Sequence, residues 1–347
     1  MSKWMTQLNK MEGAVDREYN PYLPENTIKT KSPSLNWIFS KSAGLPFGEF
    51  MLLWGPPKAG KSVVTNSFVA GLHSMDKDYM ALKFDTEMRE MGKIEPFWGI
   101  DENRFAVQNV NEPEFIFDRL KKDIFPMVEQ GMPLKLIIID SLTGIQGVKE
   151  SNRDSITNHL MGDHAKTIQD GLKAIMPFIR RNKIALISTA HIRGNMEAGS
   201  YGPKEKMAGG WAQKHTYEYF VKITRDNSAD GKKTATGESL ETEMKDFKGK
   251  SQLSGHKIYI EMTESTRGAA GRSGQITFDY NAGITNMEEE IFELSKMLSL
   301  VERPNNRTYN YDGQSFTSKN EYIDAIKNNH EMAEKLLKQI YSKQGVV

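Results

Sequence analysis

The sequence predicts an α/β protein whose core is a mostly parallel, twisted sheet flanked by helices. Two observations carry this prediction: strands and helices alternate between residues 49 and 189, and one strand, residues 134–140, is almost wholly apolar. Such alternation is typical of βαβ units, and an apolar strand of this kind is typical of the centre of a parallel sheet. Ligands of these sheets bind at the carboxyl ends of the strands, so functional residues are expected there.

The elements follow in chain order from apolar periodicity and from turn residues. Strands are expected at residues 26–32, 49–54, 79–84, 105–109, 134–140, 183–189, 217–225, 257–262 and 274–280, the last three of them antiparallel. Helices are expected at residues 34–39, from near 61 onward, at 112–130, 163–181 and 288–300, and at 318–341 as one helix or a pair. Asp312-Gly313 predicts a hairpin turn, and the polar stretch 226–256 predicts a long solvated hairpin loop.

This order predicts three parts. Residues 1–33 form a short polar helix and a Pro-rich piece, which is either a mobile terminus or an arm that docks on a neighbouring subunit. Residues 34–286 form the core, and residues 287–347 form a small C-terminal α+β domain.

Composition narrows the function classes. The 347 residues carry a net charge of +1, so nucleic-acid binding would depend on local basic loops and not on a global field. There is no cysteine, which excludes disulfides, thiol catalysis and Cys-based zinc sites and fits a reducing compartment. No apolar signal core and no 18-residue apolar run occur, so a cytoplasmic protein without a membrane span is expected.

Residues 55–62 read Gly-Pro-Pro-Lys-Ala-Gly-Lys-Ser and match the G-x-x-x-x-G-K-[ST] pattern between an apolar strand and a helix. The glycines let backbone N–H groups turn toward phosphate oxygens, and the helix start adds the positive end of its dipole. Lys61 is expected to reach the β- and γ-phosphates, and the Ser62 hydroxyl to ligate Mg²⁺. The pattern predicts ATP and Mg²⁺ as ligands. The residues expected at the nucleotide are Gly55, Pro56, Pro57, Lys58, Ala59, Gly60, Lys61, Ser62, Val63 and Asp140.

Two acids complete the expected site. Asp140 ends the apolar strand downstream of the loop, where a Mg²⁺-associated carboxylate belongs, although a strand-end Asp can also simply cap the next turn. Many phosphate-loop ATPases carry a water-activating Glu directly after this Asp, but here Ser141 follows. Glu87, at the end of the strand after the phosphate-loop helix, is therefore the candidate for that carboxylate; the alternative is a surface acid in a loop.

This order of phosphate loop, strand-end acid and Asp-Ser strand end resembles the RecA family. Residues 28–33 and the run through Gly44 and Gly48 resemble the segment that leads into the phosphate loop of UvsX-type phage recombinases. Residues 188–191 resemble the strand end where RecA proteins carry Gln and the phage proteins His. Residues 207–210 resemble the glycine pair of the second DNA-binding loop, and residues 290–313 and 330–335 resemble the C-terminal piece. The likeness covers roughly residues 26–341, outside the insertion 226–256.

The resemblance implies further roles. His191 would sense the γ-phosphate, residues 145–163 would form the first DNA-binding loop, and residues 193–215 would form the second. The DNA contacts that it implies are Lys149, Arg153, Arg193, Lys204, Lys206, Met207, Gly209 and Gly210. Arg267 would reach the neighbouring subunit's ATP, with catalytic roles shared among Lys61, Glu87, His191 and Arg267. RecA proteins carry a second cation there, where this chain has Ser265, so either Arg272 substitutes or one cation suffices.

The implied function is an ATP-dependent recombinase that forms filaments on single-stranded DNA and exchanges strands with homologous duplex DNA. The implied partners are both DNA forms, further copies of the chain, a single-strand-binding protein and a loading mediator, in the host cytoplasm if the source is a phage. Two alternatives stay open: a ring-forming RecA-fold helicase or motor, and a recombination mediator that uses ATP as a switch without strand exchange.

Overall fold

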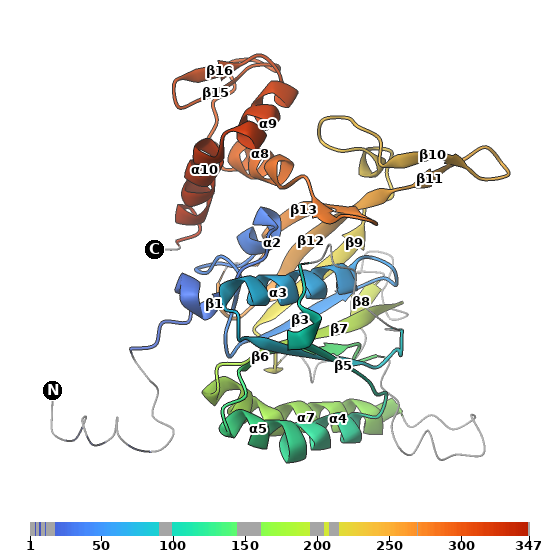
Figure 1. Cartoon of the computed structure of the whole chain (residues 1–347), viewed down its shortest axis with the longest axis vertical. Coiled ribbons are helices and arrows are strands. Elements are labelled where there is room, and N and C mark those ends of the chain that lie inside the picture. The colour runs from blue at the N-terminus through green and yellow to red at the C-terminus, as the bar shows by residue number, and fades with distance from the viewer. Residues whose placement is uncertain are drawn as a thin grey trace.

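The computed structural model describes residues 18–89, 99–143, 161–194, 205–207, 215–268 and 270–345, and residues 4, 7 and 11 singly; at 113, 161–165, 193–194 and 205–207 only the backbone is described. The predicted α/β class is confirmed. A large mixed sheet lies between two helix layers, and the C-terminal helices pack at one end of it (Figure 1).

The main sheet has six parallel strands followed by three antiparallel ones. From one edge to the other, its strands are β5 (Phe105–Asn109), β4 (Met80–Asp85), β6 (Leu134–Asp140), β7 (Ala185–Gly194), β3 (Phe50–Gly55), β9 (Tyr219–Arg225), β12 (Gly255–Ser265), β13 (Ser273–Asp279) and β14 (Gly283–Thr285). A short strand off this path, β8 (Glu205–Met207), pairs antiparallel with the end of β7. The carboxyl ends of β3, β4, β6 and β7 therefore meet at one edge.

The helices cover both faces because strand side chains alternate. Met51 and Leu53 of β3 face the core under α3 (Lys61–Met75), while Phe50 and Leu52 face the core on the other side. That second face is covered by α4 (Pro113–Arg119), α5 (Phe125–Glu129) and α7 (Met161–Arg181) (Figure 1). A π-helical turn, Leu120–Ile124, joins α4 to α5 where the sequence predicts one helix.

The elements before β3 are shorter than predicted. The strand expected at 26–32 is only β1 (Thr27–Ile28), which follows a 3₁₀ turn at Pro24–Asn26 and pairs with β2 (Leu45–Pro46). A further 3₁₀ turn, Glu102–Arg104, lies later in the chain, directly before β5. The expected short helix is α2 (Pro33–Trp37), capped by the Ser32 hydroxyl, which accepts from Leu35 N at 3.1 Å. The expected N-terminal polar helix lies outside the described residues, apart from three isolated positions.

The prediction of a long solvated loop at residues 226–256 is wrong in one respect, because this stretch contains regular secondary structure. It contains a 3₁₀ turn, Asp230–Lys232, and an antiparallel hairpin of β10 (Glu241–Lys245) and β11 (Ser251–Leu253). The buried Leu240, at 6% exposure, anchors the base of this hairpin.

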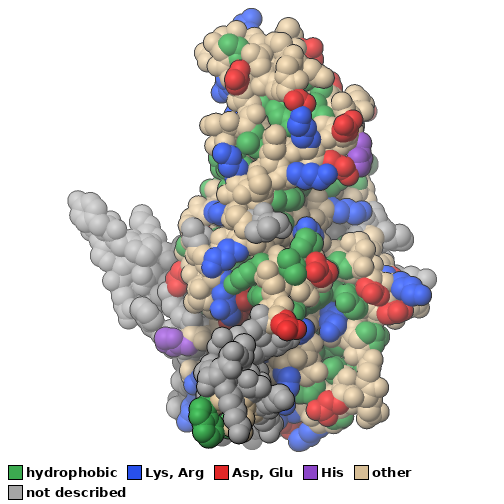
Figure 2. All heavy atoms as spheres, turned by 90° about the vertical axis from the view of Figure 1, so that its left-hand side faces the viewer, with side chains coloured by type: hydrophobic (Ala, Val, Ile, Leu, Met, Phe, Trp, Pro, Cys, Tyr) green, Lys and Arg blue, Asp and Glu red, His purple; other side chains and the backbone are tan. Residues whose placement is uncertain are grey.

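The C-terminal elements form an apolar cluster that also includes Trp37 of α2. They are α8 (Met287–Met297), the hairpin of β15 (Tyr309–Tyr311) and β16 (Gln314–Phe316), α9 (Lys319–Asn328) and α10 (His330–Ser342). Tyr322, fully buried, lies at the centre of this cluster among the rings of Phe292, Tyr309 and Phe316. The predicted hairpin turn and helix pair are thus confirmed. Acidic and basic side chains are intermixed on the face that Figure 2 shows.

A buried carboxylate joins α8 to the start of α2. Glu290 Oε2 accepts hydrogen bonds from Ser32 Oγ at 2.6 Å and from Ser34 N at 2.8 Å. The side chain is 4% exposed, and burial raises the pKa of Glu290 from its ordinary 4.5 to about 7. Ionisation of this group in the folded protein is therefore unfavourable at pH values where the unfolded chain ionises freely.

This carboxylate predicts a pH dependence of stability. Because the folded-state pKa lies above the unfolded one, the contribution of Glu290 is fully present below about pH 4.5 and is lost as the pH rises through about 7. We expect Glu290→Gln, which keeps an oxygen acceptor, to gain up to about 3 kcal/mol in free energy of unfolding relative to wild type between pH 5 and pH 8. Urea unfolding across this range measures it. The exposed Glu331→Gln should follow the wild-type profile, and a Glu290→Gln profile parallel to wild type would contradict the expectation.

Candidate nucleotide site

The phosphate loop lies between the end of β3 and the start of α3. Gly60, at φ +103°, precedes the first residue of α3, and Lys58 also has a positive φ of +60°. A Cβ at Gly55 would lie 2.1 Å from the Ile223 carbonyl oxygen, and one at Gly60 would lie 2.5 Å from Ile258 Cδ1. Gly55 is therefore required for space, because the clash is with backbone, and Gly60 for its left-handed conformation. Left-handed residues in such a loop let successive backbone N–H groups point to one side, the arrangement that binds phosphate oxygens.

Lys61 is held inside this loop. Its side-chain Nζ donates to the carbonyl oxygens of Gly55 at 3.1 Å and Pro56 at 2.9 Å, and it lies 3.3 Å from His191 Nδ1. Only 7% of the residue is exposed, and this burial lowers the pKa of Lys61. Since an ammonium group has no acceptor, His191 Nδ1 accepts, which leaves the imidazole proton on Nε2 facing Glu87.

Asp140, at the end of β6, contacts three neighbouring elements. Its Oδ2 accepts from Ser62 Oγ at 3.2 Å, and its Oδ1 accepts from Thr189 Oγ1 at 2.5 Å. Lys83, a β4 residue that is only 2% exposed, places its Nζ 3.4 Å from Asp140 Oδ2. The carboxylate thus stays paired and hydrogen-bonded although it is buried, as a buried charge requires.

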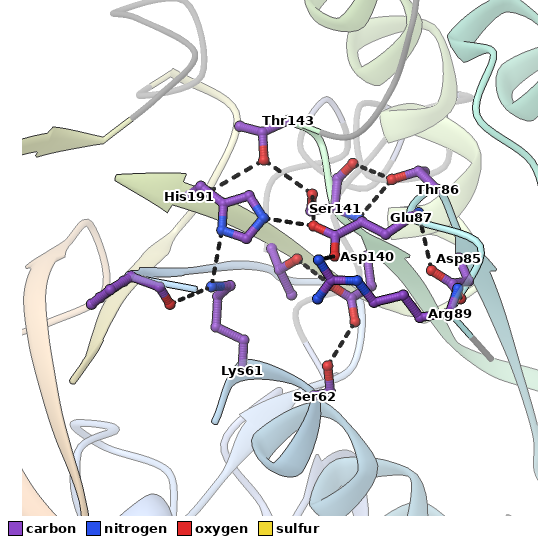
Figure 3. A network of polar contacts seen from close by, with 12 residues as sticks. Lys61, Ser62, Asp85, Thr86, Glu87, Arg89, Asp140, Ser141, Thr143 and His191 are labelled. Carbon is purple, nitrogen blue, oxygen red and sulfur yellow. Dashed lines mark hydrogen bonds and ion pairs between the residues drawn. The ribbon is translucent and has the colours of Figure 1, made fainter. Parts of the chain in front are cut away.

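Glu87 faces the same space from the end of β4 (Figure 3). Its Oε1 lies 2.6 Å from His191 Nε2 and accepts from Ser141 Oγ at 3.2 Å, while its Oε2 pairs with Arg89 Nη2 at 2.9 Å. The ends of β4 and β6 are also joined, because Thr86 Oγ1 donates to the Ser141 carbonyl at 2.6 Å and accepts from Ser141 N at 2.8 Å. A continuous polar chain therefore runs from Lys61 through His191 to Glu87.

The structure brings together five of the residues that the sequence predicts for this site: Lys61, Ser62, Glu87, Asp140 and His191. Sequence reasoning missed Lys83, Thr86, Arg89, Thr143 and Thr189 and gave Ser141 no role. For Lys83 a signal existed, since it is a single charge inside an apolar strand. The others give no local signal because their contacts join separate strands.

Arg267 lies at the opposite end of the sheet. Its Nε pairs with Glu49 Oε1 at 2.7 Å and its Nη2 lies 3.9 Å from Glu218 Oε1. Glu49 directly precedes β3, whereas the phosphate loop follows β3, and a strand of this length spans about 20 Å. Arg267 is therefore separated from the phosphate loop of its own chain by the length of a strand.

Arg272 has a different environment. Its Nη1 donates to the carbonyl oxygens of Trp37 at 3.4 Å and Phe39 at 3.3 Å, and its guanidinium lies 4.5 Å from the centre of the Trp37 ring. These contacts hold the end of α2 against the sheet. Of the two arginines, Arg267 thus has carboxylate partners, and Arg272 binds backbone carbonyl groups at the end of α2.

The expected DNA-binding loops fall mostly outside the described residues, including Lys149, Arg153, Lys204, Gly209 and Gly210. The described backbone places Arg193 opposite Lys206 in the β7–β8 ladder, and Met207 opposite Ile192. His191 lies on the same strand, two residues before Arg193. The strand that carries His191 into the nucleotide site therefore continues directly into the segment that carries these basic residues.

Among the residues that the structure describes, no three His, Cys, Asp or Glu side chains form a metal cluster. Ser62 and Asp140 nevertheless offer two oxygen donors side by side, and Mg²⁺ bound with a nucleotide uses one or two protein ligands. The residues present therefore fit such an ion. None of the described helices is long and apolar enough to cross a membrane.

Comparison with known proteins finds no family model that matches, but it finds relatives over most of the chain. RecA of Campylobacter fetus subsp. fetus is 21% identical over 331 residues, which are 95% of this chain and 87% of that protein. RecA of Campylobacter jejuni is 20% identical over 304 residues, 87% of this chain and 80% of the relative. The chain is thus similar to RecA proteins at 20–25% identity. RecA of Ureaplasma parvum serovar 3 is 25% identical over 194 residues, 54% of each chain. The α/β fold described above is thus a RecA-like core.

Proposed function

We propose that this chain is an ATP-dependent recombinase that assembles on single-stranded DNA and exchanges strands with homologous duplex DNA. Among RecA-like proteins, we assign it to the UvsX type, with a phage source. The observation that carries the proposal is the convergence of Lys61, Glu87 and His191 at the carboxyl edge of the sheet. Distant homology to RecA over 95% of the chain supports the recombination role.

Each residue has a proposed task that follows from its position. The loop N–H groups and Lys61 bind the phosphates, and Ser62 with Asp140 supplies oxygen ligands for Mg²⁺, which neutralises phosphate charge when it is bound. Glu87 accepts a hydrogen bond from the attacking water, which orients it, and takes up its proton as general base. His191 hydrogen-bonds Glu87 in this structure, and we propose that contact with the γ-phosphate redirects its ring.

The same strand links this chemistry to DNA. A change at His191 reaches Arg193 and the β7–β8 ladder through two residues of continuous strand. We propose that ATP binding holds this ladder in the arrangement that binds DNA, and that hydrolysis ends this arrangement so that the DNA is released. Arg267 lies at the strand ends opposite the phosphate loop. It would contact the ATP of a neighbouring copy in a head-to-tail filament, in which each interface joins two different surfaces. We further propose a single-strand-binding protein and a loading mediator as partners, in the host cytoplasm.

Two measurements test the proposal. ATP hydrolysis should increase several-fold when single-stranded DNA is added. Electron microscopy with single-stranded DNA and a non-hydrolysable ATP analogue should show extended helical filaments that vanish without nucleotide. Closed rings would instead support the helicase or motor, and absence of both assembly and stimulation would support the ATP-switched mediator.

A further inference from the structure

The β10–β11 hairpin extends away from the rest of the molecule (Figure 1). It lies within the insertion 226–256, outside the nucleotide site and outside the two expected DNA-binding loops. Its strands, Glu241–Lys245 and Ser251–Leu253, pair antiparallel, and residues 246–250 form the turn between them.

The turn has a defined hydrogen-bonded geometry. Asp246 Oδ1 accepts from Lys248 N at 2.8 Å and from Lys250 N at 2.9 Å, and Asp246 N donates to the Lys250 carbonyl at 2.9 Å. Gly249 has a φ of +75°, which favours glycine, and its N donates to the Asp246 carbonyl at 2.9 Å. The only acid of the turn is therefore directed at the turn's own backbone.

This turn presents an aromatic ring among cations. Phe247 is fully exposed, at 112% of the reference area, and Met244 is 68% exposed. Lys245, Lys248 and Lys250 are all exposed as well. An exposed flat ring can stack on a base, and lysines beside it can neutralise backbone phosphates, the combination that binds single-stranded nucleic acid.

The base of the hairpin is fixed to the body of the protein, which gives the tip a defined position. Within the insertion, the Leu240 carbonyl accepts from Ser254 N at 2.8 Å, and Leu240 N donates to the Lys232 carbonyl at 2.8 Å. Ala235 N donates to Glu289 Oε2 of α8 at 2.5 Å. Because this base is hydrogen-bonded, the tip already has a defined position before a ligand binds, and binding does not have to order the whole insertion.

We infer that the β10–β11 tip is an additional binding site for single-stranded DNA, with Phe247 stacked on a base and Lys245, Lys248 and Lys250 at phosphates. The choice of DNA as the nucleic acid rests on the proposed function. A protein partner fits less well, because one Phe and one Met supply far less apolar area than the roughly 800 Å² per partner of a stable interface. A single strand fits better than a duplex, because only unpaired bases leave their faces free.

A single thiol makes the tip observable, since the chain contains no cysteine. Gln252→Cys, on β11 beside the turn, carries an environment-sensitive dye, and Glu129→Cys at the end of α5 carries the same dye as a control. With a single-stranded oligonucleotide and a non-hydrolysable ATP analogue, the dye at residue 252 should respond and the dye at 129 should not. A response of the 252 dye to anionic phospholipid vesicles but not to the oligonucleotide would overturn the inference.

Substitutions then test the contacts. Phe247→Ala should weaken single-strand binding about tenfold, and Phe247→Trp should retain it. Replacing Lys245, Lys248 and Lys250 with Gln should reduce the slope of log K against log salt by about 0.7 for each phosphate that is no longer neutralised. The matched control replaces Lys121, Lys327 and Lys338, all exposed elsewhere, and should leave the slope unchanged.

The outcomes separate this inference from the proposed function. If the unsubstituted protein binds no single-stranded DNA, the proposed function fails. If it binds and both hairpin variants bind with its affinity and salt slope, only the hairpin inference fails. Equal losses for single-stranded and blunt duplex DNA on Phe247→Ala would overturn the stacking contact.

Discussion

Replacing Glu87 with glutamine should lower the rate of ATP hydrolysis by about 10²–10⁴-fold while leaving ATP and single-stranded DNA bound. The amide retains an oxygen near the position of Oε1, but it cannot act as a base toward the attacking water. Lys61, Ser62 and Asp140 remain in place, because Glu87 contacts none of the three directly in the described hydrogen bonds. Steady-state phosphate release with and without DNA measures the effect.

A matched control is Glu114→Gln, an exposed acid on α4 that should leave the rate unchanged. Retained DNA binding in the Glu87 variant is equally important, since the proposal assigns hydrolysis to release. A wild-type rate of ATP hydrolysis in Glu87→Gln would contradict the proposed role of Glu87 in the reaction. Loss of ATP binding would show that it holds the site together and does not act on water.

Replacing Lys83 with methionine should lower the free energy of unfolding by about 3 kcal/mol. Methionine fills similar space, but it leaves the buried Asp140 carboxylate without the ammonium 3.4 Å from its Oδ2. Removing one member of a buried ion pair is costly because the remaining charge stays desolvated. Denaturant unfolding monitored by circular dichroism measures the loss.

Two comparisons isolate the ion pair. Lys135→Met, on the neighbouring strand β6, removes a lysine whose Nζ donates to the Asn182 carbonyl at 3.3 Å. This substitution should lower the free energy of unfolding clearly less than Lys83→Met does. The double variant Lys83→Met with Asp140→Asn should be more stable than Lys83→Met alone, because the uncompensated charge is gone. A double variant less stable than the single one would show that Lys83 contributes mainly through packing.

Most strands were predictable because their signal is local. The apolar run 134–140 matches β6 residue for residue, and 105–109 matches β5. The strand expected at 26–32 shortens to Thr27–Ile28, since only those residues find a partner in β2. The hairpin in 226–256 was missed because its strands are polar, and their pairing depends on the turn around Asp246 and on a base fixed to α8.

The candidate site was predictable in part. The spacing of residues 55–62 and the strand ends at Asp85 and Asp140 place phosphate-binding and acidic groups at one edge, because parallel strands end together. The hydrogen bonds that link Lys61, His191 and Glu87 required strand order, because β7 lies next to β3 and only β6 separates it from β4. The sequence by itself does not give this order of strands in the sheet.

By itself, the sequence determined the phosphate loop, the α/β class and the identity of the strand-end acids, because each depends on residues close together in the chain. Only the tertiary structure decided that Lys83 pairs with Asp140 and that Arg272 binds the end of α2 while Arg267 faces Glu49. These contacts join segments far apart in the sequence. Their geometry follows from strand order and register, which depend on the packing of the whole sheet.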